Sequence, residues 1–100
     1  ETVRTLATKG ARVIFNPTYG MHDERNLHMM QTRSYESEVF IAFTHPGQSL
    51  LTGPAGDVKC NEISTESEFT ICEADLAEVE KIRSSEISHL KDRKDAIYEL

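Results

Sequence analysis

The sequence contains no long hydrophobic segment. None of its apolar runs approaches the ~18 consecutive residues that a membrane-spanning helix requires, so we expect no transmembrane segment. Hydrophobic residues make up 38% of the chain, slightly below the usual globular share even with the 5 glycines added, but too many for a disordered tail. A chain of 100 residues is long enough for one compact domain with a small core.

Clusters of positive charge are also missing. Lysine and arginine number 11 against 17 aspartate and glutamate residues, and the formal net charge is −6. The richest basic segment, residues 91–95, interleaves basic with acidic side chains and is typical of a solvated surface. We therefore expect neither a nucleic-acid partner nor a membrane partner.

Cysteine is scarce as well. Cys60 and Cys72 are too few for a disulfide framework and have no metal-ligand spacing. We expect both to be small buried residues of strands and not catalytic thiols. The four histidines show no metal spacing either, so we predict no metal and no cofactor. The first residues do not resemble a signal peptide, and a reducing, cytoplasmic location is the expectation.

Hydrophobic periodicity predicts alternating helices and strands in the first half of the chain. A helix over residues 1–9, ended by Gly10 as a left-handed cap, precedes a strand over 11–15 that stops at Asn16-Pro17. A second helix over 23–37 buries Leu27 and Met30, with either Ser34 or Tyr35 continuing its buried stripe. The apolar strand over 39–43 follows.

The second half of the chain is predicted to be mainly antiparallel. Strands over 49–52 and 58–60 flank the turn residues 53–57, and a further strand covers 69–74. Asp75 is a natural N-cap for a helix over 76–83, and residues 84–100 form a polar C-terminal arm. These elements predict an α/β fold with a mixed sheet over one incomplete domain, residues 1–100.

Polar side chains at the ends of two predicted strands are candidates for substrate binding. His45 ends a buried strand at the position where α/β proteins often bind ligands, while Asn16, Thr18 and Tyr19 follow the preceding strand. The alternative is that these residues only cap strands and form turns.

Arg33 and Glu36 form a second candidate set on the helix over 23–37. Their i, i+3 spacing fits a surface ion pair, which would contribute only a few tenths of a kcal/mol (~0.2–0.5). The other interpretation places them at the rim of an active site, where Glu36 orients Arg33 or a catalytic neighbour.

Five segments, in order and at compatible spacing, resemble motifs of one family. The first runs from Glu1 through Arg4 to Asn16-Pro17-Thr18, and the others cover residues 33–40, 49–58, 74–83 and 90–98. Residues 33–40, for example, read Arg-Ser-Tyr-Glu-Ser-Glu-Val-Phe, where the family has Arg-Ala-x-Glu-Asn-x-x-Phe. On these motifs the chain resembles the nitrilase superfamily, the carbon-nitrogen hydrolases.

The resemblance implies the C-terminal half of a four-layer αββα sandwich that is cut before Glu1. Members of this family hydrolyse amide, nitrile or carbamoyl substrates with a Glu base, a Lys and a Cys nucleophile. No residue here matches any of the three, since Glu1 matches the last residue of the motif that begins with the Cys. The resemblance therefore implies an inactive fragment without catalytic residues of its own, from a homo-oligomeric hydrolase.

Two alternatives remain open at this point. The chain could be a non-catalytic relative, an assembly or dimerisation module that uses the helix over 23–37 and the C-terminal arm. The other alternative is that the chain is an unrelated small α/β binding domain.

Overall fold

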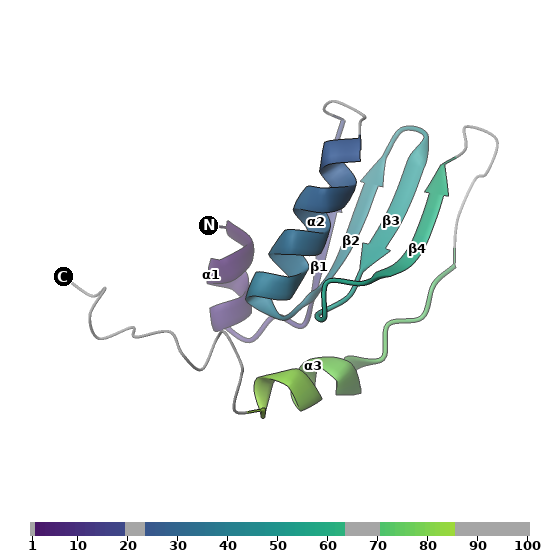
Figure 1. The fold of residues 1–100 in the computed structure, drawn as a ribbon. Helices are drawn as coiled ribbons and strands as arrows, with labels where there is room; N and C mark the ends of the chain where they lie inside the picture. Colours follow the sequence, from purple (N-terminus) through teal and green to yellow (C-terminus); the bar gives the residue numbers. More distant parts are fainter. Residues whose placement is uncertain (1, 20–23, 64–70, 86–100) are drawn as a thin grey trace.

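The computed structural model describes residues 2–19, 24–63 and 71–85. These residues form three helices and one four-stranded sheet (Figure 1). In chain order the elements are α1 (Thr2–Thr8), β1 (Val13–Pro17), α2 (Glu24–Ser37), β2 (Phe40–His45), β3 (Gln48–Thr52), β4 (Val58–Ile63) and α3 (Leu76–Arg83).

The sheet is mixed, as the sequence predicts. Its strand order is β1-β2-β3-β4, with β1 parallel to β2 and the other two pairs antiparallel. Helix α2 connects the parallel strands and lies across one face of the sheet (Figure 1). A parallel pair needs such a long crossover, whereas the antiparallel strands need only tight turns.

Helices α1 and α2 cover one face of the sheet and form the larger core with it. Ala7 and Met30 from the helices contact Ile41, Phe43 and Leu50 from the strands. The predicted stripe of α2 is confirmed in its Ser34 form, because Met30, Ser34 and Ser37 are buried while Tyr35 is 49% exposed.

The opposite face of the sheet, here called the open face, carries Val13, Phe15, Ala42, Leu51 and Cys60. Only one end of it is covered by a helix of the described chain, where α3 packs Val79 against Phe40 and Leu51. Within residues 2–19, 24–63 and 71–85, the open face is therefore apolar and largely without a second layer.

Two helix ends use left-handed residues. Gly10 has φ 103° and ends α1, with bonds from Gly10 N to Ala7 O (3.0 Å) and from Ala11 N to Leu6 O (3.0 Å), as predicted. Helix α2 ends in the same way, but its left-handed residue is Glu38, with φ 57°, and Val39 N donates to Ser34 O at 3.2 Å. A glutamate in this position is strained, because its Cβ crowds the backbone.

Several predicted boundaries shift. Strand β1 begins at Val13 and includes Asn16 and Pro17, which were expected to end it. Because β1 lies at the edge of the described sheet, Pro17 can lie in it without removing an inner ladder hydrogen bond there. Strand β4 extends to Ile63, beyond the predicted 58–60. At α3, Asp75 accepts a hydrogen bond from Ala77 N at 3.0 Å, which confirms the N-cap.

The predicted strand over residues 69–74 is not found. Residues 69 and 70 lie outside the described residues, and 71–75 form no strand within the part that the structure describes. This segment runs over the open face and not beside a sheet edge, so no strand of the described sheet lies next to it to form a ladder. Most of the predicted arm, residues 86–100, also lies outside the described residues.

Candidate functional site

The carboxyl ends of β1 and β2 lie side by side, which places the four candidate binding residues on one edge of the sheet. Pro17 is the register partner of Thr44, and Thr18 N donates to Thr44 O at 2.8 Å. Asn16 and Thr18 are thus brought close to the end of the strand that carries His45. Tyr19 continues beyond this edge and is 86% exposed.

The side chains of these candidates do not converge on one another. Asn16 is directed toward α2, where its Nδ2 lies 3.7 Å from Met30 Sδ. His45 stacks on Phe43, with ring centroids 6.4 Å apart, and its Nδ1 lies 2.8 Å from Pro46 O. Asn16 and His45 therefore occupy the helix-covered side of the edge, away from the open face.

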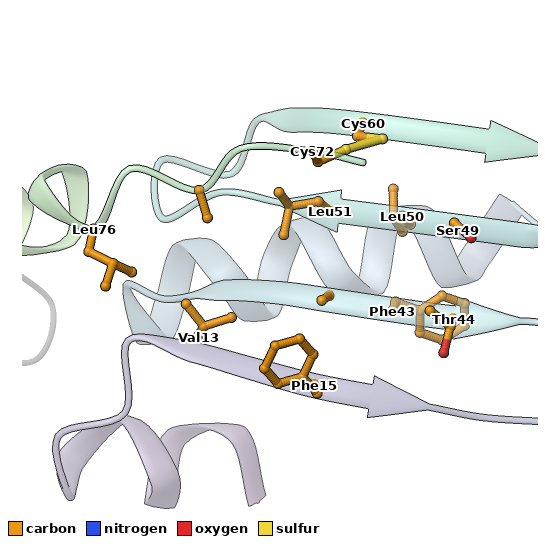
Figure 2. Close-up of a pocket in the computed structure, with 12 residues that line it drawn as sticks. Val13, Phe15, Phe43, Thr44, Ser49, Leu50, Leu51, Cys60, Cys72 and Leu76 are labelled. Atoms are coloured by element: carbon orange, nitrogen blue, oxygen red, sulfur yellow. A yellow bond between two sulfur atoms is a disulfide. The ribbon is translucent and has the colours of Figure 1, made fainter. Parts of the chain in front are cut away.

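A cavity of about 690 Å³ lies over the open face (Figure 2). Of the described residues that line it, none is charged, and Phe15 within it is 78% exposed. Apart from the hydroxyl groups of Thr44 and Ser49, the described side chains that line it are apolar or sulfur-containing, so they supply no acid, base or charged group for catalysis. Its lining is formed by Val13, Phe15, Ala42, Phe43, Thr44, Ser49, Leu50, Leu51, Cys60, Cys72, Ala74 and Leu76.

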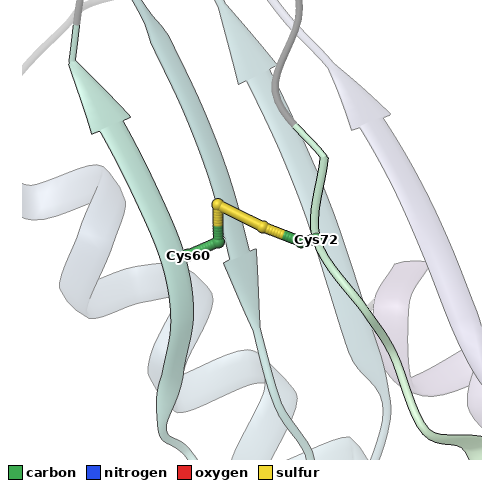
Figure 3. Close-up of a disulfide and its surroundings, with 2 residues drawn as sticks. All are labelled: Cys60 and Cys72. Atoms are coloured by element: carbon green, nitrogen blue, oxygen red, sulfur yellow. A yellow bond between two sulfur atoms is a disulfide. The ribbon is translucent and has the colours of Figure 1, made fainter.

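The two cysteines correct the prediction that they are separate buried thiols. Cys60 and Cys72 form a disulfide with a Cα–Cα distance of 6.3 Å (Figure 3). Cys60 is half-buried and Cys72 is exposed, because Cys72 belongs to the segment 71–75 that runs over the sheet. The chain has no free cysteine, and neither sulfur is a nucleophile in this state.

Arg33 and Glu36 lie on the outer surface of α2, and both are exposed. Glu36 Oε2 is 3.9 Å from the Arg4 guanidinium of α1. Nearby, Gln31 Nε2 donates to Gly56 O at 2.9 Å, so that α2 is tied to the β3–β4 turn. No local pattern in the sequence indicates this contact, which joins residues that are distant in the chain.

A charged group beside the left-handed end of α2 was not predicted from the sequence. Arg83 donates to Ala11 O at 2.6 Å, while its Nε is buried without a hydrogen-bond partner among the described residues. Burial lowers the pKa of Arg83, and the nearby carboxylates of Glu38 and Glu80 oppose that shift. Glu38 itself is fully buried. The only hint in the sequence was that Arg83 belongs to one of the five family motifs.

A second charged group links β4 to α3. Lys59 Nζ lies 2.8 Å from Asp57 Oδ2 and 2.8 Å from Glu78 Oε1. Its hydrogen bonds to Asp57 and then Glu78 raise the pKa of Lys59. All three side chains are partly exposed, so this group contributes to the placement of α3 more than to chemistry.

The described part of the chain holds neither a membrane span nor a metal cluster. Among its three helices, none is long and apolar enough to cross a membrane. Over residues 2–19, 24–63 and 71–85, no group of three or more histidine, cysteine, aspartate or glutamate side chains could hold a metal ion. What the described residues offer is therefore an apolar face and a polar strand edge.

Comparison with solved structures finds the same fold in amidases. A cysteine-to-alanine variant of the Nesterenkonia AN1 amidase, from the nitrilase superfamily, matches with a TM-score of 0.63 at 20% identity, over 96% of this chain and 37% of that one. A glutamate-to-glutamine variant of the Nesterenkonia sp. AN1 amidase, with acrylamide added at its active-site cysteine, matches with a TM-score of 0.70 at 18% identity, over 96% and 38%. The chain thus spans little more than a third of the amidases that it resembles.

Sequence comparison gives the family. A search of curated proteins finds no match. Residues 1–84, in contrast, match the family model described as carbon-nitrogen hydrolase. This match covers most of the chain, and it agrees with the mixed sheet and with the solved amidase folds. The chain belongs to the carbon-nitrogen hydrolase family.

Proposed function

We propose that this chain is part of a hydrolase that acts on non-peptide carbon-nitrogen bonds in amide, nitrile or carbamoyl substrates. The observation that carries the proposal is the family match over residues 1–84. The solved amidases of the same fold include one with the acetamide moiety of fluoroacetamide bound covalently at its active-site cysteine. In our proposal the Cys, Glu and Lys of the reaction come from polypeptide outside these 100 residues.

The proposed chemistry divides among those three groups. The thiolate attacks the substrate carbon, the carboxylate transfers protons, and the ammonium stabilises the negative charge that develops on the substrate. This chain would add the polar edge formed by Asn16, Thr18, Tyr19 and His45, where backbone and side-chain groups can bind the polar atoms of a small substrate. Its open face would form one wall of the enzyme's core.

The test is a panel of aliphatic amides, nitriles and carbamoyl compounds. We expect the intact protein that carries this sequence to release ammonia from at least one class, while purified residues 1–100 release none. The chain alone lacks a free thiol, so the two preparations should differ completely. Turnover by residues 1–100 that is lost in Cys60→Ala or Cys72→Ala would contradict this assignment, and an intact protein inert on the whole panel would favour a non-catalytic role.

We further propose that Arg33 and Glu36 support the active site, and Glu36→Gln tests this. In the intact enzyme we expect kcat/KM to fall by at least ~10-fold, which exceeds the effect of an ordinary exposed ion pair. Glu80→Gln is the control, because Glu80 pairs with Arg12 at 3.4 Å and is 62% exposed, against 56% for Glu36. Since the Glu80 carboxylate also lies near Arg83, the melting temperature of each variant is measured together with its activity. Equal, near-wild-type activity in both variants would leave Glu36 as a surface residue.

A non-catalytic assembly or dimerisation module is the second candidate. It is favoured by the absence of a charged side chain among the described residues that line the open-face cavity. In either case we propose a homo-oligomer, with α2 and the C-terminal arm at the subunit contacts, and a cytoplasmic location. Sedimentation of the intact protein distinguishes the homo-oligomer from a monomer. Cell fractionation distinguishes a cytoplasmic protein from an exported one.

A further inference from the structure

We propose that the hydroxyl groups of Thr44 and Ser49 bind the uncharged amide or carbamoyl group of the substrate in the intact enzyme. This assignment rests on the proposed hydrolase function, and it names two residues of this chain that contact the substrate. Both residues belong to paired strands, and their register stays the same when a second layer covers the open face.

The two residues lie opposite each other on neighbouring strands. Thr44 is the register partner of Ser49 in the antiparallel β2–β3 pair. Both side chains point to the open face, because Ala42 and Leu51, two residues further along the same strands, belong to the core on that face. Side chains directly opposite on an antiparallel pair have Cβ atoms about 4.5–5.5 Å apart. The two hydroxyls can therefore reach one polar group of a ligand together.

The hydroxyls form the outermost row of the open face at the candidate binding edge. Strand β2 ends one residue after Thr44, and β3 begins one residue before Ser49. Further from this edge, the same face carries apolar side chains such as Phe15 and Leu51 (Figure 2). The open face thus changes from apolar to polar at the edge where the parallel strands β1 and β2 end.

A second layer over the open face agrees with this division. The layer would pack on the apolar rows and turn them into core, whereas hydroxyls that become buried need hydrogen-bond partners. Ligands of α/β proteins bind outside the carboxyl ends of parallel strands. In the intact enzyme, a substrate at this edge would lie against the outermost row and supply partners for Thr44 and Ser49.

The hydroxyls are carried by ordered strands and not by a loop. Thr18 N donates to Thr44 O at 2.8 Å, so that β2 is held by β1 on one side and by β3 on the other. The turn between β2 and β3 has only two residues, and its Gly47 has φ 87°. Strands hold a binding group more precisely than loops do.

The neighbouring charge favours an uncharged substrate group. Ser49 is the register partner of Glu62, which lies two residues beyond Cys60 and so on the open face as well. A substrate carboxylate would be repelled by Glu62. An amide or carbamoyl group has a carbonyl oxygen that accepts and N–H groups that donate, and a hydroxyl can do both. A nitrile offers only an acceptor.

A purely structural hydroxyl pair is the competing interpretation, since Thr and Ser that lie opposite on a sheet can hydrogen-bond each other. The chain contains such a structural pair on the helix-covered side of the sheet. The hydroxyl oxygens of Ser34 and Thr52 lie 2.6 Å apart, and both residues are fully buried. Thr52→Val is therefore a matched control for the loss of a hydroxyl that contacts no substrate.

The test measures kcat, KM and melting temperature of the intact protein with aliphatic amides, carbamoyl compounds and nitriles. For an amide, we expect kcat/KM to fall at least ~10-fold in Thr44→Val and in Ser49→Ala, because each loses a hydrogen bond to the substrate. Thr44→Ser keeps the hydroxyl and should stay within about 3-fold of the wild type. Thr52→Val should melt at a lower temperature but keep the kcat/KM of the wild type.

The outcomes separate this assignment from the hydrolase function. If Thr44→Val and Ser49→Ala match Thr52→Val in kcat/KM, the hydroxyls are structural and the assignment is wrong, although the enzyme is a hydrolase. Activity on nitriles alone would contradict the substrate class. A wild-type protein that releases no ammonia from any compound would refute the hydrolase function and the assignment with it. Ser49→Ala, the smaller change, decides the matter if Thr44→Val does not fold.

Discussion

Phe15→Ala is expected to lower the free energy of unfolding of the intact protein by about 3–5 kcal/mol, the usual effect of removing a buried phenylalanine. In the described structure Phe15 is 78% exposed on the open face, and an exposed position would predict almost no loss. The large expected effect follows from the proposal that the intact enzyme covers this face with its second layer. Phe15 would then become a core residue.

Two control variants show the effects expected for a buried and for an exposed apolar residue. Phe40→Ala should be costly in any case, because Phe40 is fully buried within the chain itself. Ile63 is 64% exposed on the other side of the sheet, so Ile63→Ala should change stability by less than about 0.5 kcal/mol. Denaturant unfolding of the three variants decides the matter. If Phe15→Ala behaves like Ile63→Ala, the open face faces solvent in the intact protein and the sandwich proposal is wrong.

Glu38→Ala should destabilise the protein by about 2–3 kcal/mol, since it removes the buried one of the two carboxylates near the partly buried Arg83 guanidinium. Glu38 is fully buried and interacts with Arg83, which donates to Ala11 O in the segment between α1 and β1. The left-handed backbone at Glu38 destabilises the fold, and any L residue with a side chain, alanine included, retains that strain.

Glu38→Gly separates these two effects. Glycine removes the carboxylate but also relieves the left-handed strain, so this variant should be about 1 kcal/mol more stable than Glu38→Ala. A double-mutant cycle with Arg83→Met should give a coupling energy of at least about 1 kcal/mol. A coupling near zero, measured by the same denaturant unfolding, would mean that Glu38 and Arg83 do not stabilise each other.

Much of the fold could be predicted because local chemistry decides it. Gly10 adopts a positive φ at little cost, Asp75 caps a helix through its own side chain, and Met30 and Ser34 repeat with the period of one helix face. The mixed sheet follows from one crossover and two short turns. For these elements, the deciding interactions lie within a few residues of one another.

Other features depend on how distant segments meet, and the sequence does not contain that information in a local form. The Cys60–Cys72 pair depends on the register of β4 and on the path of residues 71–75. Glu38 carries no local signal for a left-handed conformation, which glycine or asparagine would have given. The strand over 69–74 was predicted from its alternation alone, but a strand also needs a neighbour.

The candidate binding edge was predicted in position but not in detail. Strand ends mark the carboxyl edge of a parallel pair, so Asn16, Thr18 and His45 could be placed near one another. Which face each side chain takes depends on the alternation along β1 and β2 and on which face of the sheet the helices cover. The direction of Asn16 toward Met30 could therefore be known only from the register.

The order of the strands also distributes the entropy of folding unevenly. Strands β2, β3 and β4 follow one another through short turns, so each new ladder closes only a small loop. Pairing β1 with β2 instead requires the chain to order all of α2 and the residues on either side of it. Because the cost of closing a loop grows with its length, most of the entropic cost of assembling this sheet falls on β1. Forming the hairpins loses little conformational entropy, whereas adding the strand that carries Phe15 and Asn16 loses most of it.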